Sequence, residues 1–325
     1  MKKKLFIIIG LIMGLMFFCV FNIAEVHGDA AEDYFDRGND YLKRGQYREA
    51  ISEYNKVLQI DSSQSVVYYN IALAYDRLGE SQQAIKYYQK AINTGSGYPS
   101  AYHNLALLYD RLGQQQQAIN YYQKSIDASP GEYESYFNLG NLYSDLGEKQ
   151  KAVTYYQKAI QRNPNDASIY YNLGNAYSFL ERGEEAINSY QKAIKIDPYR
   201  VEFYGNLGLE YYYAEQDQKA ISAYQKALEI EPNSTMINYE LGMTYAALGE
   251  FGKAVSFFKK VLEIDPNYAD AYYKLGLVYS WELFDYEKAM ENLQKAKKIY
   301  QSRQNHQKVK EVEESIEELQ YAGMF

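Results

Sequence analysis

The pattern of small, aromatic and polar positions in this chain repeats every 34 residues. Five of the six prolines keep this spacing: Pro130, Pro164, Pro198, Pro232 and Pro266. If Pro130 is counted as position 32 of a unit, units begin at residues 31, 65, 99, 133, 167, 201, 235 and 269. In all of them position 8 is glycine or alanine and position 11 is tyrosine. Such a period is typical of a helical hairpin that is copied along the chain and packs only against neighbouring copies.

Each unit is predicted to form two amphipathic helices joined by a tight turn. In the fourth unit the apolar positions favour helices over residues 134–145 and 149–162, with Gly147 in the turn. Asn163 and Pro164 then end the second helix, because proline cannot continue a helix interior. The predicted organisation is eight repeats over residues 31–64, 65–98, 99–132, 133–166, 167–200, 201–234, 235–268 and 269–303.

This pattern resembles the tetratricopeptide repeat. The fourth unit carries every residue of that family's pattern: Tyr136, Leu139, Gly140, Tyr143, Ala152, Tyr156, Ala159 and Pro164. The resemblance implies an all-α fold, a right-handed superhelical α-solenoid of tandem helix-turn-helix units. It also implies that the first helices line a concave groove at positions 2, 5, 9, 12 and 13, where a peptide or a segment of a partner protein binds.

The regular pattern changes in units five and six and after the eighth unit. Glu181 and Glu215 stand in turns where other units have glycine. After the last unit, apolar residues recur at helical spacing between charged residues: Val309, Val312, Ile316 and Leu319. This spacing predicts a capping helix within residues 304–325 that covers the last repeat.

Residues 1–30 have the composition of an export signal. Three lysines precede an uninterrupted apolar or glycine run from Leu5 to Phe21. The run is long for a cleaved signal peptide and slightly short for a membrane span of about 20 residues. We therefore expect a signal peptide, with an uncleaved signal anchor as the alternative and membrane contact only through residues 5–21 if it is retained. The signal resembles a bacterial one, which favours the periplasm or the outer face of the inner membrane.

Composition argues against several classes of function. The formal net charge of −8 disfavours a nucleic-acid partner, whose phosphates require a basic face. The single cysteine, Cys19, lies inside the apolar run, so the repeats carry no thiol chemistry. His103 lies in the third unit and His306 lies after the eighth, and no metalloprotease, hydrolase or phosphate-binding motif is present. No catalytic residue, metal site or cofactor is predicted.

The candidate partner-binding residues are the variable positions of the implied groove. Position 5 is aromatic or histidine in most units: Tyr69, His103, Phe137, Tyr171, Tyr239 and Tyr273. Position 13 changes from basic to aromatic along the chain: Lys43, Arg77, Arg111, Phe179, Tyr213 and Trp281. Asn141 and Asn175 at position 9 are candidates for hydrogen bonds to a ligand backbone.

These residues favour a groove in which acidic side chains of an extended segment meet the basic residues, while its apolar side chains meet the aromatic ones. A purely structural interpretation is open as well. Position-5 aromatics, His103 among them, can pack between helices, and the arginines beside Asp76 and Asp110 can be solvated surface charges.

The predicted function is a non-catalytic scaffold or adaptor of the cell envelope that binds a protein or peptide. Two alternatives are a glycan-binding envelope protein that uses the aromatic groove, and a membrane-anchored accessory subunit of an envelope assembly.

Overall fold

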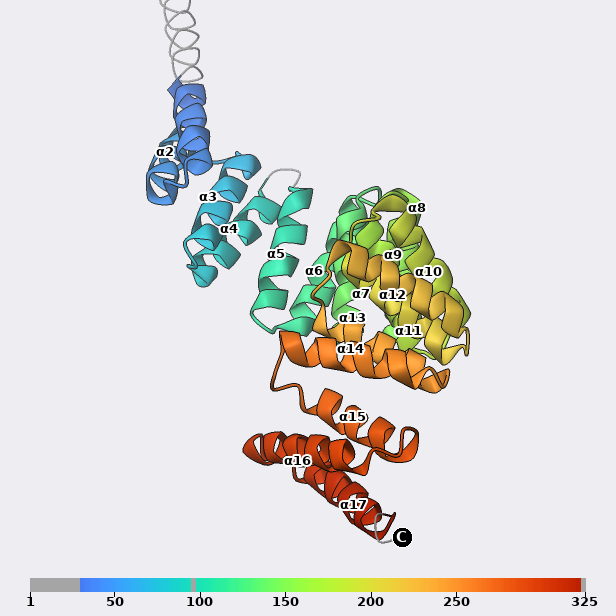
Figure 1. Cartoon of the computed structure of the whole chain (residues 1–325). Coiled ribbons are helices and arrows are strands. Elements are labelled where there is room, and N and C mark those ends of the chain that lie inside the picture. Colours follow the sequence, from blue (N-terminus) through green and yellow to red (C-terminus); the bar gives the residue numbers. More distant parts are fainter. Residues whose placement is uncertain (1–29, 95–97, 323–325) are drawn as a thin grey trace, which may run out of the picture. The chain divides into compact units, whose positions relative to one another are not determined.

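The computed structural model describes residues 30–94 and 98–322, and within these ranges all regular structure is α-helical (Figure 1). The chain divides into two compact units at the turn after Leu146. The N-terminal unit contains a helix over residues 30–43, α2 (Tyr47–Ile60), α3 (Ser65–Arg77), α4 (Ser81–Asn93), α5 (Pro99–Arg111), α6 (Gln115–Ala128) and α7 (Tyr133–Asp145). The C-terminal unit contains α8 (Lys149–Arg162), α9 (Ala167–Phe179), α10 (Gly183–Ile196), α11 (Val201–Tyr213), α12 (Asp217–Ile230), α13 (Thr235–Ala247), α14 (Phe251–Ile264), α15 (Ala269–Trp281), α16 (Tyr286–Ser302) and α17 (His306–Ala322).

Within each unit the helices form hairpins that stack on the next hairpin. The pairs α3–α4 and α5–α6 make hairpins in the N-terminal unit, and α9–α10, α11–α12, α13–α14 and α15–α16 do so in the C-terminal unit. Each second helix also packs on the following first helix, as α4 does on α5 and α10 on α11. The predicted fold class is confirmed, and α7 and α8 match the helices expected in the fourth repeat within one residue.

The core of a hairpin is a tyrosine ring placed against a small residue of the facing helix. Tyr190 and Tyr224 at position 24 are buried, and their rings lie against Gly174 and Gly208 at position 8. A Cβ atom added to either glycine would lie 2.5 Å from the ring. This contact explains why small and large residues recur 16 positions apart in the sequence.

The turn inside each hairpin needs a left-handed backbone. Glycines occupy it in five repeats with φ between 70° and 78°: Gly45, Gly79, Gly113, Gly147 and Gly249. Glu181 and Glu215 hold the same conformation, with φ of 58° and 56°. The turn geometry is therefore kept in repeats five and six although the sequence departs from glycine.

Helix α17 ends the array by packing on α16 and α15. Its Val312 and Leu319 are buried, and Val309 and Ile316 are packed against the same core cluster. The predicted capping helix is confirmed by these contacts.

The predicted export signal, residues 1–30, lies almost wholly outside the described residues, and its cleavage stays a prediction. Among the helices that the structure does describe, none combines the length and apolar character that crossing a membrane requires.

Candidate functional site

Three large aromatic side chains are exposed at the C-terminal ends of first helices in the C-terminal unit. Phe179 ends α9, Tyr213 ends α11 and Trp281 ends α15, and they are 67%, 71% and 59% exposed. All three stand at position 13, which the family resemblance places on the concave face. The equivalent residue of α13 is Ala247, which is also exposed. The predicted aromatic half of the groove is therefore open to solvent at these positions.

A cavity of about 540 Å³ lies beside Trp281. Apolar side chains from α13 and α15 line much of it, including Met243, Ala246 and Leu277. Charged groups at its edge include Lys274 and, from α17, Glu318. This volume lies within the range of pockets that bury a small ligand or an anchoring side chain.

The aromatic residues at position 5 are half-buried and pack between helices. The ring of Tyr171 lies 5.9 Å from that of Tyr190 in its own hairpin and 5.0 Å from that of Phe203 in the next repeat. Tyr239 makes the same kind of contacts with Phe258 and Tyr268, at 5.7 and 5.4 Å. Spacings of this size are typical of favourable aromatic pairs. Position 5 therefore contributes to the packing between repeats.

Position 5 behaves in the same way in the N-terminal unit. Tyr69 packs on Tyr88 and Tyr98, and its hydroxyl accepts a hydrogen bond of 2.6 Å from Nδ2 of Asn104. Phe137 on α7 is half-buried as well.

The asparagine at position 9 takes part in a hydrogen-bond network inside the scaffold. Oδ1 of Asn175 accepts from the Tyr190 hydroxyl at 2.7 Å and from Nδ2 of Asn206 in the next repeat at 2.9 Å. Asn39 receives the same two bonds from Tyr54 and Asn70. The side-chain oxygen of Asn175 is thus engaged within the protein, and only its side-chain NH₂ group remains to donate hydrogen bonds to a ligand. Asn141 holds the equivalent position on α7 and is half-buried.

The predicted basic residues end three first helices of the N-terminal unit, and only one of them is paired. Lys43, Arg77 and Arg111 are exposed. The Arg111 guanidinium forms an ion pair with Asp76 of the preceding repeat. Within the described residues no ion pair involves Lys43 or Arg77. The positive charge of Arg111 is thus largely compensated, which lowers the capacity of this wall for acidic ligands.

His103 lies at the wall of a polar cavity of about 310 Å³ in the N-terminal unit. Its Nδ1 is 2.8 Å from Oγ of Ser135, and its ring contacts the ring of Tyr122 edge-on at 5.9 Å. Burial lowers the pKa of His103, and the nearby Glu134 opposes this shift. The imidazole is therefore neutral at neutral pH and serves as a packed, hydrogen-bonded group.

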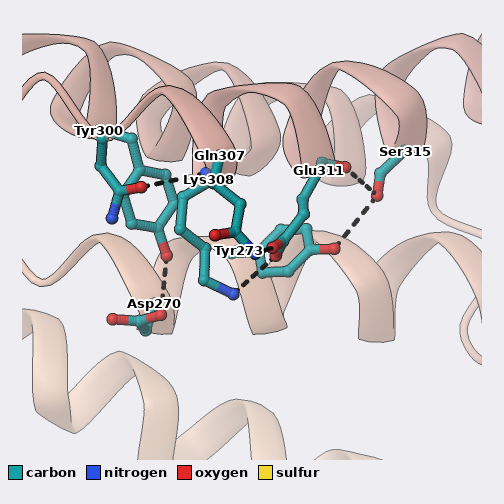
Figure 2. Close-up of polar contacts among 8 residues, drawn as sticks. Asp270, Tyr273, Tyr300, Gln307, Lys308, Glu311 and Ser315 are labelled. Atoms are coloured by element: carbon teal, nitrogen blue, oxygen red, sulfur yellow. Dashed lines mark hydrogen bonds and ion pairs between the residues drawn. The ribbon is translucent and has the colours of Figure 1, made fainter.

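Helix α17 covers Tyr273, which the sequence placed in the open groove (Figure 2). The Tyr273 hydroxyl is 3.4 Å from Oγ of Ser315, and Nζ of Lys308 lies 5.9 Å from the centre of its ring. Nearby, the Tyr300 hydroxyl donates a 2.7 Å hydrogen bond to Asp270. Sequence spacing predicted α17 but not this coverage, because it does not reveal which side chains α17 contacts.

A further feature that sequence reasoning missed is the relation between positions 12 and 13 of successive repeats. The ion pair joins Arg111 to Asp76, not to its sequence neighbour Asp110. A sequence signal for this pair exists, because aspartate at position 12 stands beside arginine at position 13 in two successive repeats, but the sequence does not show which side chains meet across repeats. Among the described residues no group of three or more histidine, cysteine, aspartate or glutamate side chains is placed to hold a metal ion.

The helical hairpins and their repeat pattern agree with comparisons to known families. Models described as "Tetratricopeptide repeat" match residues 66–131, 133–166, 167–199, 201–234, 223–256 and 269–303, and a "TPR repeat" model matches 38–79 and 242–280. This chain belongs to the tetratricopeptide repeat family. The matches together span nearly all of residues 38–303, which include every candidate groove residue. No curated protein matches the chain.

Solved tetratricopeptide repeat structures resemble large parts of the chain. The C-terminal part of a repeat-containing protein from Cytophaga hutchinsonii is 22% identical, with a TM-score of 0.65 over 73% of this chain and 97% of its own, which supports the fold alone. YrrB, described as a TPR protein with an unusual peptide-binding site, is 30% identical, with a TM-score of 0.50 over 59% of this chain and 97% of its own. MamA is also 30% identical, with a TM-score of 0.50 over 53% of this chain and 94% of its own.

Proposed function

We propose that this tetratricopeptide repeat protein is a non-catalytic scaffold of the cell envelope that binds an extended segment of a partner protein on its first helices. The repeat family supports an interaction role, and the peptide-binding site described for YrrB, at 30% identity, supports a peptide-like ligand.

The observation that carries this proposal is the exposure of Phe179, Tyr213 and Trp281. Burial of an aromatic side chain of this size stabilises a protein or a complex by roughly 1.5–3 kcal/mol. Because these three side chains are mostly exposed in the free protein, most of that free energy is still available for binding. Exposed aromatic side chains that gather on one class of helix are typical of interaction surfaces. The cavity beside Trp281 offers a place where an apolar side chain of the partner segment is buried.

Selection from a random-peptide display library on the purified full chain tests the binding role. We expect peptides with apolar anchors to be enriched, and enrichment to be lost in a variant that combines Phe179→Ser, Tyr213→Ser and Trp281→Ser. The matched control is Tyr199→Ser, because Tyr199 is 79% exposed but lies in the loop between α10 and α11. Equal enrichment on the native protein and the triple variant would contradict the proposed surface.

Trp281 is the only tryptophan of the chain and serves as a reporter for the identity of the ligand. Addition of an enriched peptide should shift or quench its fluorescence, since binding removes the indole from water. Quenching by a mixture of envelope glycans, without any enriched peptide, would instead support the glycan-binding alternative.

The envelope location is supported by the basic and apolar pattern of residues 1–21. Mass spectrometry of the protein from a bacterial envelope fraction tests it. A mature N-terminus near Asp29 or Ala31 supports export with cleavage, whereas a retained residue 1 in the membrane fraction supports the anchored alternative.

A further inference from the structure

Three polar side chains meet between repeats three and four of the N-terminal unit. Nδ1 of His103 on α5 lies 2.8 Å from Oγ of Ser135 on α7, and Oγ of Ser125 on α6 lies 2.8 Å from the same oxygen. Ser125 and Ser135 are buried, with 4% and 2% of their surface exposed. These three residues, the polar trio, all line the cavity of about 310 Å³. One wall of this cavity is therefore a hydrogen-bonded polar network.

The equivalent positions two repeats later hold an apolar cluster. They are Tyr171, Ala193 and Phe203. Ala193 and Phe203 are buried in one hydrophobic cluster, and Tyr171 packs against it with its ring 5.0 Å from that of Phe203. The repeat thus accepts apolar residues at all three positions. The polar trio is a local departure in which Ser135 replaces a phenylalanine ring, and the smaller side chain leaves space beside it.

The carboxylates at the cavity have no cation of their own. Glu132 and Glu134 line it without any lysine or arginine, and neither takes part in an ion pair within residues 30–94 and 98–322. Two repeats later, Arg200 stands at the position of Glu132, and Glu202 stands at that of Glu134. Nε of Arg200 donates a hydrogen bond of 2.7 Å to Glu202, and the guanidinium carbon lies 5.5 Å from the centre of the Phe203 ring. The later junction therefore supplies a cation that the earlier junction lacks.

The uncharged groups at the cavity can accept hydrogen bonds from such a cation. Nδ2 of Asn104 donates a hydrogen bond of 2.6 Å to the Tyr69 hydroxyl, which leaves the side-chain oxygen of Asn104 to accept. The hydroxyl groups of Ser100 and Ser129 are acceptors as well. An ammonium or guanidinium group only donates, and its hydrogen bonds to carboxylates are among the strong ones. The lining therefore matches an organic cation.

Other classes of ligand fit this lining less well. An anion would meet two carboxylates and no basic side chain. The ring of Tyr69 already packs on those of Tyr88 and Tyr98, at 5.9 and 4.6 Å, so it offers no open face to a sugar. A metal ion requires more ligands, and no group of three or more suitable side chains exists in the described part of the chain.

We propose that this cavity binds an ammonium or guanidinium group, which takes the place that the guanidinium of Arg200 fills two repeats later. The cavity volume lies at the small end of ligand pockets and fits one such group with its alkyl chain. Glu134 and His103 stand at positions 2 and 5, which the family resemblance places on the concave face. The cation is therefore a lysine or arginine side chain of the partner segment, in which case the inference rests on the proposed function, or a free small amine.

Ligand-observed NMR titrations of the full chain in phosphate buffer test this inference. Butylamine and butylguanidine carry the cation, and butanol is their neutral control. The peptide acetyl-glycyl-lysyl-glycinamide presents the same cation on a peptide backbone, and its neutral control has norleucine in place of lysine. The two sets of probes distinguish a free amine from a side chain of a segment.

A charge-matched pair of variants separates the cavity from the general negative charge of the protein. Glu132→Arg supplies the residue found at Arg200, and its guanidinium should pair with Glu134 and fill the site from within. The control combines Glu32→Gln and Glu49→Gln, which remove two exposed carboxylates of repeat one. Both proteins gain two units of positive charge relative to the native chain, so a non-specific attraction of amines weakens equally in both.

A second variant removes the polar trio without a change of charge at the carboxylates. It combines His103→Tyr, Ser125→Ala and Ser135→Phe, which reproduce the apolar cluster between repeats five and six. Circular dichroism and thermal unfolding check that each variant keeps its helix content. Because Glu132→Arg changes only an exposed residue, it keeps the test decisive if the triple variant folds poorly.

We expect butylamine and butylguanidine to bind the native protein at least tenfold more tightly than butanol. Glu132→Arg and the triple variant should each weaken this binding at least tenfold, and the control should stay within twofold of the native protein. If the lysine peptide binds at least as tightly as butylamine while the norleucine peptide does not bind, the cation comes from a partner segment. If butylamine binds and the lysine peptide does not, the ligand is a free amine.

Equal binding of butanol and butylamine, an equal loss in Glu132→Arg and the control, or no binding of any cation would overturn this inference. The proposed function would stand, because the selection of peptides by the exposed aromatic residues depends on the other unit. If no peptide is enriched in that selection but butylamine binds as expected, the proposed function fails and the cavity remains a site for a free amine.

Discussion

The hydroxyl of Tyr190 donates a hydrogen bond of 2.7 Å to Oδ1 of Asn175, whereas the equally buried hydroxyl of Tyr224 has no partner among the described residues. Leu209 stands one repeat after Asn175 and offers no acceptor. The residue at position 9 therefore decides whether the tyrosine at position 24 is satisfied. Repeats seven and eight avoid the conflict, since Met243 and Leu277 at position 9 accompany side chains without a hydroxyl at position 24.

We expect opposite responses to removal of these two hydroxyls. Tyr190→Phe should lower stability by about 1 kcal/mol, because a made hydrogen bond is lost and Asn175 keeps only one donor. Tyr224→Phe should leave stability unchanged or raise it by about 1 kcal/mol, because it removes a buried group without a partner. Thermal unfolding followed by circular dichroism measures both. A loss of stability in Tyr224→Phe as large as in Tyr190→Phe would show that water or an unseen partner satisfies the second hydroxyl.

The two glutamates in left-handed turns provide a second test. A non-glycine residue in this conformation costs roughly 1–2 kcal/mol, while glycine adds an entropic cost of about 0.5–1 kcal/mol. Glu181→Gly and Glu215→Gly should therefore each raise stability by up to about 1 kcal/mol. Gly79→Ala is the reverse control: φ is 75°, and an added Cβ would meet nothing within 4 Å, so any loss comes from the backbone alone. Destabilisation of both glutamate variants would contradict this explanation.

The elements that could be predicted from sequence are those determined within one repeat. The ends of α7 and α8 follow from local apolar spacing, Gly147 and Asn163-Pro164. The close contact of Gly174 with Tyr190 recurs between Gly38 and Tyr54 and between Gly208 and Tyr224. Each of these features is repeated along the chain, so each repeat supports the interpretation of the others.

The candidate site was less predictable because its properties arise between repeats. Whether Arg111 forms its ion pair with Asp110 or with Asp76 depends on how far α5 is offset from α3. This offset cannot be deduced from the sequence of a single repeat. In the same way, the spacing that predicted α17 does not indicate that Ser315 and Lys308 lie over Tyr273. The exposed aromatics Phe179, Tyr213 and Trp281 were predictable as a group, since all three stand at position 13, which the family resemblance assigns to the concave face.

The contribution of the capping helix α17 to stability can be measured by substitution of Leu319, which is 3% exposed. Leu319→Ala leaves a cavity against α15 and α16 and should weaken the docking of α17 by about 2–4 kcal/mol. Because each repeat contacts only its neighbours, the effect should remain local. Hydrogen exchange should show lost protection in α17 and α16 but not in α9 and α10. Tyr321→Ala, at a 71% exposed position of the same helix, should leave exchange unchanged, and an equal effect of both variants would contradict a packing role for Leu319.

The lowered pKa of His103 predicts how the stability of the N-terminal unit depends on pH. Burial lowers its pKa below the usual value of about 6.5, so below that pH the unfolded chain binds more protons than the folded protein. Stability contributed by this group is therefore present near neutral pH and is lost as the pH falls through 6.5. The charged groups that face it are Glu134, which partly opposes the shift, and Glu132 across the same cavity.

The measurement is the melting temperature of the native protein and of His103→Gln between pH 7.5 and pH 5.5. Glutamine keeps a polar group near Ser135 but does not titrate, and the carboxylates of the chain titrate equally in both proteins. We expect the native protein to lose more stability than the variant over this range. Parallel curves would show that His103 has an ordinary pKa, and a native protein that is the less sensitive of the two would show that Glu134 outweighs burial and raises it.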